Sequence, residues 1–282
     1  MKILVIGDMH VGSIYGIAPL ESIPEDRTNA WSKWVYESWE DLCKKHRNPD
    51  YLLLIGDLAD GPQVRILGTD ALFTDIDRQV EIASKLLDMV KGDAQIFGVN
   101  GSGYHGGEGL ATNIDRRVIE KIGGKCEGNK FTLDLPLERI QMSHGGAGSS
   151  TVGLDSYLKR EMMFSKIDAQ KRKIVSPTII LRGHQHRMFT VQDDARQWGI
   201  LNGCWQYTTP FMAKKSVNIS PSIGATMIEI EDATKIYRLE YPIPENVREE
   251  IDGFESLTLE RTEEERQKNL EVLKTTLKDK KF

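Results

Sequence analysis

Short apolar segments alternate with amphipathic segments along the first two thirds of the chain. Runs of mostly apolar residues that end in glycine or polar residues indicate strands buried on both faces of a parallel sheet. Apolar residues that recur at helical spacing between these runs predict helices. The predicted strands are residues 3–6, 51–55, 94–99 and 178–181, and the predicted helices are residues 28–46, 75–90, 111–122 and 155–171.

Strands dominate the remainder of the pattern. Two segments around Pro136, residues 131–135 and 139–142, resemble a pair of strands. The later segments that favour strands are residues 188–191, 199–201, 225–230 and 235–241. Alternating strands and helices that are followed mostly by strands predict an α/β fold, with helices outside two sheets.

The composition changes after Pro244, so we separate a main domain, residues 1–245, from a C-terminal region, residues 246–282. Thr262 and Glu265 have the spacing of a helix capping box. A narrow apolar stripe follows, formed by Leu270, Leu273 and Leu277. We expect a helical tail that either docks on the main domain or makes a contact in a homo-oligomer.

Composition and charge narrow the function classes. The 282 residues suffice for one large core or two small ones. The net charge of -5 argues against a strongly basic face for duplex DNA. No apolar stretch reaches about 18 residues, so no membrane span is expected. Cys43, Cys126 and Cys204 are odd in number and far apart, which argues against a disulfide framework and favours a cytoplasmic location.

Histidines, acids and one amide gather where predicted strands end. A parallel sheet brings the ends of many strands to one edge, where ligands bind. Imidazole, carboxylate and amide groups at such an edge predict a transition-metal site. The residues concerned are Asp8, His10, Asp57, Asn100, His105, His144, His184 and His186.

This set of side chains would suit two adjacent divalent cations, which can activate water and stabilise both reacting oxygens of a phosphate ester. Asp57 suits a bridging position, because it follows a glycine at a strand end. Asp8 and His10 are two positions apart and can turn toward one ion. His184 and His186 have the same spacing and can supply one nitrogen to each ion. The set is completed by His144 and the amide oxygen of Asn100.

Five motifs follow one another between residues 7 and 186, namely Asp8-x-His10, Gly56-Asp57-x-x-Asp60-Gly61, Asn100 with His105, His144-Gly145 and Gly183-His184-x-His186. Together they make the chain similar to the calcineurin-like metallophosphoesterase family. The resemblance implies a four-layer α/β/β/α sandwich, which agrees with the predicted order of elements. It also implies two ligand sets, with metal 1 held by Asp8, His10, Asp57 and His186 and metal 2 held by Asp57, Asn100, His144 and His184.

The resemblance also bears on the cofactors. Family members commonly use Mn²⁺, and sometimes iron, zinc or nickel. We therefore expect two divalent metal ions, with manganese favoured over iron, zinc and nickel.

The third motif departs from the family pattern. The family usually has Gly-Asn-His followed by an acid, with the asparagine as a metal ligand and the histidine as a proton donor to the leaving oxygen. Here four residues separate Asn100 from His105. Either Asn100 stays the ligand and a glycine-rich loop returns His105 to the cleft, or the role of Asn100 has moved to Ser102 or been lost. We favour Asn100, because it lies at the end of its strand. We expect His105 to be the catalytic acid or a transition-state stabiliser.

Other polar and aromatic residues carry open alternatives. Asp60 either orients a metal ligand or caps the turn before Gly61. Trp205 and Tyr207 either line the cleft or pack in the core. Further candidates for contacts with the ligands or the substrate are Ser102, Tyr104 and Arg187, and Arg182 is a candidate for a phosphate contact.

These expectations combine into a dinuclear metal-dependent phosphoesterase, in which a metal-activated water attacks a phosphate ester. Phosphodiesters are favoured over monoesters as substrates, because of the glycine-rich loop and because the family resemblance implies diesters. The alternatives are a phosphomonoesterase or a nuclease with the same site and, in another class, a catalytically weak metal-binding scaffold. The substrate could be a nucleotide or a single-stranded nucleic acid. The irregular third motif and the segment Gly203-Cys204-Trp205-Gln206 are also similar to phage and prophage members of the family.

Overall fold

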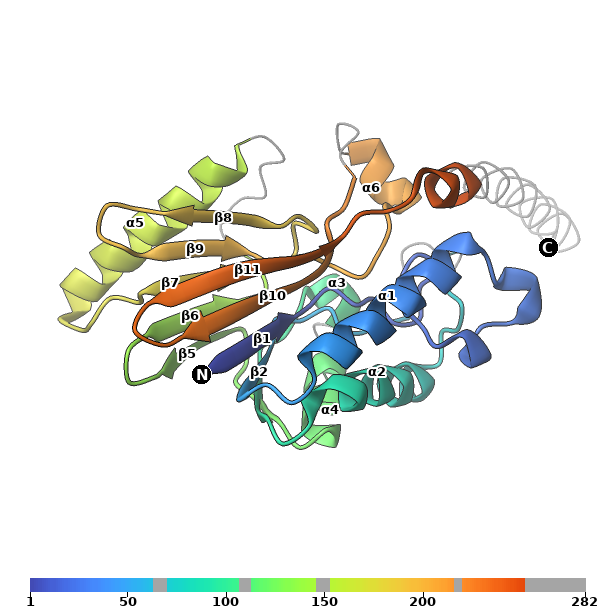
Figure 1. The fold of residues 1–282 in the computed structure, drawn as a ribbon, viewed down its shortest axis with the longest axis horizontal. Coiled ribbons are helices and arrows are strands. Elements are labelled where there is room, and N and C mark those ends of the chain that lie inside the picture. The colour runs from blue at the N-terminus through green and yellow to red at the C-terminus, as the bar shows by residue number, and fades with distance from the viewer. Residues whose placement is uncertain (63–69, 107–112, 146–152, 216–219, 252–282) are drawn as a thin grey trace, which may run out of the picture.

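The computed structural model describes residues 1–62, 70–106, 113–145, 153–215 and 220–251. Its strands form two sheets that share an apolar interface, and helices cover the outer face of each sheet (Figure 1). The fold is therefore the expected four-layer α/β/β/α sandwich of the metallophosphoesterase type.

The first sheet has six strands in the order β11-β10-β1-β2-β3-β4. Strands β1 to β4 run parallel, while β10 is antiparallel to both β1 and β11. The carboxyl ends of β1, β2 and β3 therefore lie at one edge. The strands are β1 (Lys2–Ile6), β2 (Tyr51–Leu54), β3 (Gln95–Gly98), β4 (Lys125–Cys126), β10 (Ile223–Ile230) and β11 (Thr234–Tyr241).

The second sheet has five strands in the order β5-β6-β7-β9-β8. Its central strands β6, β7 and β9 are parallel, and β5 and β8 pair antiparallel at the two edges. The parallel centre again places consecutive strand ends side by side. The strands are β5 (Lys130–Asp134), β6 (Arg139–Ser143), β7 (Ile179–Arg182), β8 (Phe189–Gln192) and β9 (Trp198–Leu201).

Helices form the two outer layers. Helices α1 (Ala30–His46), α2 (Ile76–Lys91) and α4 (Ile114–Lys121) pack their apolar faces on the first sheet. Helix α5 (Leu154–Arg172) covers the second sheet, where Tyr157 and Leu158 pack against Leu201. The remaining helical turns are α3 (Gly103–Gly106), α6 (Pro210–Lys215) and two 3₁₀ turns, η1 (Leu20–Ser22) and η2 (Glu25–Arg27).

Local signals explain where the elements begin. Helix α1 starts at a capping box in which Asn29 accepts a hydrogen bond from the backbone N–H of Ser32. The helix predicted over residues 111–122 begins at Ile114, because Asn113 caps it. Strand β4, helices α3 and α6 and the two 3₁₀ turns were not predicted, since elements this short leave no periodic pattern.

The C-terminal region starts on the main domain. Residues 245–251 are helical, and Val247 and Ile251 are buried in the core beside the first sheet. The Glu250 carboxylate accepts a hydrogen bond of 2.7 Å from the backbone N–H of Ala30. The predicted apolar stripe of Leu270, Leu273 and Leu277 lies outside the described residues. The domain boundary and the oligomer contact stay predictions.

Candidate metal centre

The loops after β1, β2 and β7 hold their polar side chains on an uncommon backbone. Left-handed φ angles occur at Asp8 (50°), His10 (48°), Asp57 (49°), His184 (69°) and His186 (54°). This conformation costs a residue other than glycine about 1–2 kcal/mol. Neighbouring loops stabilise it, since the backbone N–H of Asp8 donates to Gly56 and that of His10 donates to Asp57. Backbone strain concentrated at five polar positions of one edge indicates a functional site.

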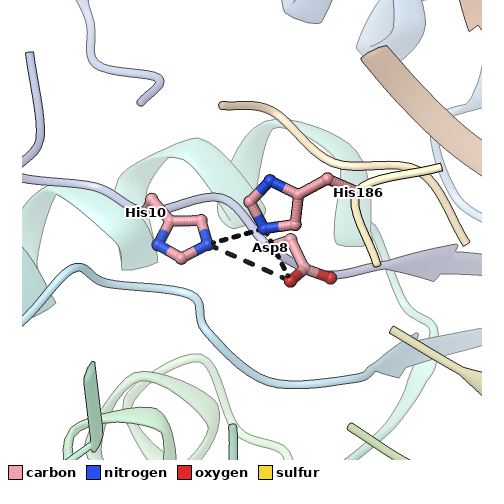
Figure 2. A group of neighbouring side chains, drawn as sticks. All are labelled: Asp8, His10 and His186. Atoms are coloured by element: carbon pink, nitrogen blue, oxygen red, sulfur yellow. Dashed lines mark hydrogen bonds and ion pairs between the residues drawn. The ribbon is translucent and has the colours of Figure 1, made fainter. Parts of the chain in front are cut away.

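The first group of side chains consists of Asp8, His10 and His186, all of which are buried. Figure 2 shows that their polar atoms face one another. The Nε2 atoms of His10 and His186 are 3.2 Å apart. Asp8 Oδ1 lies 3.2 Å from His186 Nε2 and 3.9 Å from His10 Nε2. The fold thus joins one loop of each sheet in a single cluster.

The second group consists of Asp57, His144 and His184. His144 Nε2 lies 2.9 Å from Asp57 Oδ2 and 3.2 Å from His184 Nδ1. The two groups adjoin, because Asp8 Oδ1 is 3.9 Å from His144 Nε2 and accepts a hydrogen bond from the backbone N–H of His184. The structure therefore brings six of the seven predicted metal ligands into two adjacent groups.

The spacing of these atoms fits metal coordination. With metal–ligand bonds of about 2.1 Å and angles of about 90–110°, neighbouring ligand atoms lie about 3.0–3.4 Å apart. The separations of 3.2 Å between His10 and His186, and of 3.2 Å between His144 and His184, fall within that range. A mixed set of imidazole nitrogens and carboxylate oxygens suits Mn²⁺, Fe²⁺ or Zn²⁺. Each group can therefore hold one divalent ion.

Charges in the cluster favour ionised carboxylates, a neutral His10 and a protonated His144 in the absence of metal. Burial alone would raise the pKa of Asp57, but the positive charge of His144 outweighs it and holds that pKa well below the usual range. Burial would likewise lower the pKa of His144, but Asp57 and Asp8 raise it to about 10. Burial lowers the pKa of His10, which favours the neutral imidazole. Ionised carboxylates and neutral imidazoles are the forms that bind metal, so Asp57 and His10 already have the binding form, whereas a metal ion must displace the proton that Asp57 and Asp8 favour on His144.

Asp60 links the first group to His105. Its Oδ1 atom lies 3.0 Å from His10 Nδ1 and 3.2 Å from His105 Nδ1, and its backbone carbonyl lies 2.9 Å from His105 Nδ1. Burial would lower the pKa of His105, but Asp60 and Asp57 raise it to about 9. Asp60 therefore contacts two imidazoles, and its role in orienting a metal ligand stays a prediction. His105 keeps 18% of its side chain exposed, which leaves it accessible to a substrate.

The loop after β3 presents Ser102, rather than Asn100, to Asp57. The Asn100 amide donates to Asn129 Oδ1 at 2.9 Å and accepts from Cys126 Sγ at 3.2 Å. By contrast, the backbone N–H and the hydroxyl of Ser102 donate to Asp57 Oδ1 at 2.7 and 3.2 Å. The predicted ligand Asn100 is therefore the one that the structure does not place in either group.

The remaining candidates for a substrate or phosphate contact are Tyr104, Arg187 and Arg182. Tyr104 is 36% exposed, and its ring packs edge-on against His105 at 4.8 Å between centroids. Arg187 is half-buried directly after His186, and burial lowers its pKa. The proposed phosphate contact of Arg182 is not supported, because its buried guanidinium pairs with Glu161 on α5 at 3.0 Å.

Trp205 and Tyr207 belong to the core. Trp205 is fully buried and meets Trp39 edge-on at 4.8 Å between centroids, and Tyr207 packs on Trp31. Their alternative place in the cleft is therefore excluded. The backbone N–H of Trp205 nonetheless donates to the carbonyl of Asp8 at 2.9 Å, so this segment supports the loop after β1.

Sequence reasoning missed Asp115, a buried acid at the start of α4. Its two carboxylate oxygens accept hydrogen bonds from the backbone N–H groups of Leu58 at 2.9 Å and Gly101 at 2.7 Å. Burial and the nearby charge of Asp57 raise its pKa to about 6. The sequence signal for Asp115 is its place in the first turn of a predicted helix. This signal is weak, because acids are common at that position.

Comparisons with known proteins agree with this geometry. The family model described as calcineurin-like phosphoesterase matches residues 1–188, which contain all of the motifs above. A search of the curated proteins found no match to this sequence. Along the part of the chain that the structure describes, no helix is long and apolar enough to cross a membrane.

Solved structures to which this chain is similar include those of a Vps29, an archaeal phosphodiesterase and Yfce. The Zn²⁺ complex of Vps29 from Entamoeba histolytica is 15% identical, with a TM-score of 0.44 over 86% of this chain and 100% of its own. An archaeal phosphodiesterase is 11% identical, with a TM-score of 0.43 over 84% of this chain and 99% of its own. Yfce, a phosphoesterase from E. coli, is 13% identical, with a TM-score of 0.43 over 85% and 93%.

Proposed function

The chain belongs to the calcineurin-like phosphoesterase family, and we propose that this metal-dependent phosphoric ester hydrolase acts with two divalent ions. The observation that carries the proposal is the pair of adjacent ligand groups, each with converging nitrogen and oxygen atoms. Bound ions would supply a water nucleophile near neutral pH and stabilise charge on the phosphoryl oxygens. The first ion would be held by Asp8, His10 and His186, and the second by Asp57, His144 and His184.

Ser102 replaces Asn100 as the contribution of the loop after β3. The Asn100 amide is engaged by Asn129 and Cys126, whereas Ser102 already lies on Asp57. Asp57 would be the carboxylate shared by the two ions: its Oδ2 atom lies 2.9 Å from His144 Nε2 of the second group, and its charge also acts on His10 of the first. The Ser102 hydroxyl would therefore be the seventh ligand, in place of the Asn100 amide.

His105 acts as the proton donor to the leaving oxygen. Its Nδ1 atom faces the carbonyl and the carboxylate of Asp60, so the proton on Nδ1 is fixed and the ring is held in one orientation. Its partial exposure leaves the ring accessible to a substrate. A poor alkoxide leaving group gains most from a proton donor, so this arrangement supports an alkyl phosphate ester as substrate. The preference for a diester over a monoester rests on the family resemblance and on the glycine-rich loop.

The substrate preference is tested with two chromogenic esters. We expect the Mn²⁺-loaded protein to hydrolyse bis-p-nitrophenyl phosphate faster than p-nitrophenyl phosphate. On a dinucleotide, whose leaving group is an alkoxide, His105→Ala should lose about 100-fold or more in kcat, and it should lose less on bis-p-nitrophenyl phosphate, whose p-nitrophenolate leaves without a proton. His46→Ala, at the end of α1, is the matched control and should match wild type. Faster monoester turnover would overturn the diester preference, and an unimpaired His105→Ala would overturn the role of His105.

Four finer features rest on sequence alone. We propose Mn²⁺ as the native metal, a nucleotide or a single-stranded nucleic acid as the natural diester, a cytoplasmic location and a phage-type origin. Nuclease activity on single-stranded oligonucleotides, followed by gel electrophoresis, distinguishes a nucleic-acid substrate from a small diester.

A further inference from the structure

Two loops of the proposed centre approach each other backbone to backbone. The loop after β2 carries Asp57, and the loop after β3 carries Ser102. A Cβ atom at Gly56 would lie 2.4 Å from Gly101 Cα, and one at Gly101 would lie 2.1 Å from Asp57 Oδ1. Only glycines allow this approach, so the contact between Ser102 and Asp57 depends on the spacing of the two loops.

Asp115 lies behind this contact, with 1% of its surface exposed. One carboxylate oxygen accepts the backbone N–H of Leu58, the residue after Asp57, and the other accepts the N–H of Gly101, the residue before Ser102. A single carboxylate therefore ties both loops to the start of α4. The two hydrogen bonds are charge-assisted, which makes them stronger than bonds to a neutral acceptor.

A buried carboxylate close to another one is costly in the absence of a compensating role. Burial and the charge of Asp57 both disfavour ionisation of Asp115 and raise its pKa, yet its two oxygens hold the amides beside Asp57 and beside Ser102. We infer that Asp115 is a positioning residue that fixes Asp57 and Ser102 in the geometry needed by the second ligand group. This inference rests on the proposed function, because it assigns Asp115 to the metal centre proposed above.

The test compares Asp115→Asn with a matched control, Asp193→Asn. Asp193 also accepts two backbone N–H groups, from Ala195 and Gln197 at 3.0 Å each, but it lies in the hairpin between β8 and β9. Asparagine has one acceptor oxygen and an N–H₂ group, so Asp115→Asn loses one of its two backbone tethers. In Asp193→Asn the single oxygen can still accept both amides, which share Oδ1, and the ion pair with Lys166 is lost instead. Isothermal titration of the metal-free proteins with MnCl₂ gives the number of sites and each Kd.

We expect Asp115→Asn to weaken one of two Mn²⁺ equivalents by about 10- to 100-fold, and Asp193→Asn to leave both unchanged. Hydrogen exchange of the metal-free variants adds a readout that does not depend on metal: protection should fall at Leu58 and Gly101 in Asp115→Asn alone. If Asp115→Asn does not fold, the same measurements on Asp115→Glu, which displaces the carboxylate by one carbon, decide the matter.

The outcomes separate the two claims. Wild-type protein that binds fewer than two Mn²⁺ ions contradicts the proposed function. Wild-type protein that binds two, together with an Asp115 variant of unchanged affinity, contradicts only the positioning role. Equal losses of affinity in the Asp115 and Asp193 variants would also contradict it, since general destabilisation would then explain both.

Discussion

Asp60→Asn is the substitution that separates metal binding from proton transfer in this centre. The Asp60 carboxylate is 2% exposed and lies 3.0 Å from His10 Nδ1 and 3.2 Å from His105 Nδ1. Asparagine keeps one oxygen for one of these imidazoles and turns its N–H₂ group toward the other. A hydrogen bond to a charged group is worth about 1.5–3 kcal/mol. Losing one corresponds to a factor of about 10–150, at about 1.4 kcal/mol for each factor of ten.

Loss of the hydrogen bond to His10 and loss of the hydrogen bond to His105 should change different measured quantities. Misorientation of His10 should raise the Kd of one Mn²⁺ ion, whereas misorientation of His105 should lower kcat at saturating Mn²⁺. The assay is steady-state hydrolysis of a dinucleotide, whose leaving group is an alkoxide, as a function of MnCl₂ concentration. In the His105→Ala background, Asp60→Asn should lower kcat no further, because its effect on kcat passes through His105.

Two results would refute this reasoning. Asp60→Asn with the Mn²⁺ affinity and kcat of wild type would show that the carboxylate orients neither imidazole. Additive losses in kcat for the double variant would show that Asp60 does not act through His105. Asp77→Asn, an exposed acid in the first turn of α2, controls for the loss of a negative charge.

Other parts of the structure give predictions that are independent of Asp60. Ser102→Ala should weaken one Mn²⁺ site by about 10-fold or more while Asn100→Ala should not, and titration calorimetry showing the reverse order would restore Asn100 as the ligand. Glu161→Gln should lower the Tm of the metal-free protein by about 5 °C, since a broken buried pair with Arg182 costs about 3 kcal/mol, and a calorimetric Tm within about 1 °C of wild type would contradict this. EDTA should lower the Tm of Mn²⁺-saturated protein by about 5 °C per site, because ligand at 100 times its Kd contributes about 2.7 kcal/mol, and a scan unchanged by EDTA would count against bound metal.

The sequence predicted the site best where each ligand follows its own strand. Asp8, Asp57 and His144 could be assigned because a strand ending in a polar residue places that residue at the sheet edge whatever the rest of the chain does. The fold class followed from the same alternation of strands and helices, because buried parallel strands have a distinct apolar pattern.

Contacts between distant segments could not be predicted in this way. Asp115 reaches Leu58 across 57 positions, and Arg182 meets Glu161 of another element, so no local spacing records either pair. Asn100 follows its strand as expected, yet its amide turns to Asn129, which the next strands bring beside it. The position of Trp205 could not be predicted for the same reason, since its burial against Trp39 depends on how α1 packs on the first sheet.

The central claim is that the two ligand groups hold two metal ions side by side. Anomalous diffraction from crystals grown with MnCl₂, recorded near the manganese absorption edge, tests it directly. The account predicts two peaks per chain, one bonded to Asp8, His10 and His186 and the other to Asp57, His144 and His184. A single peak, or peaks away from these side chains, would contradict it.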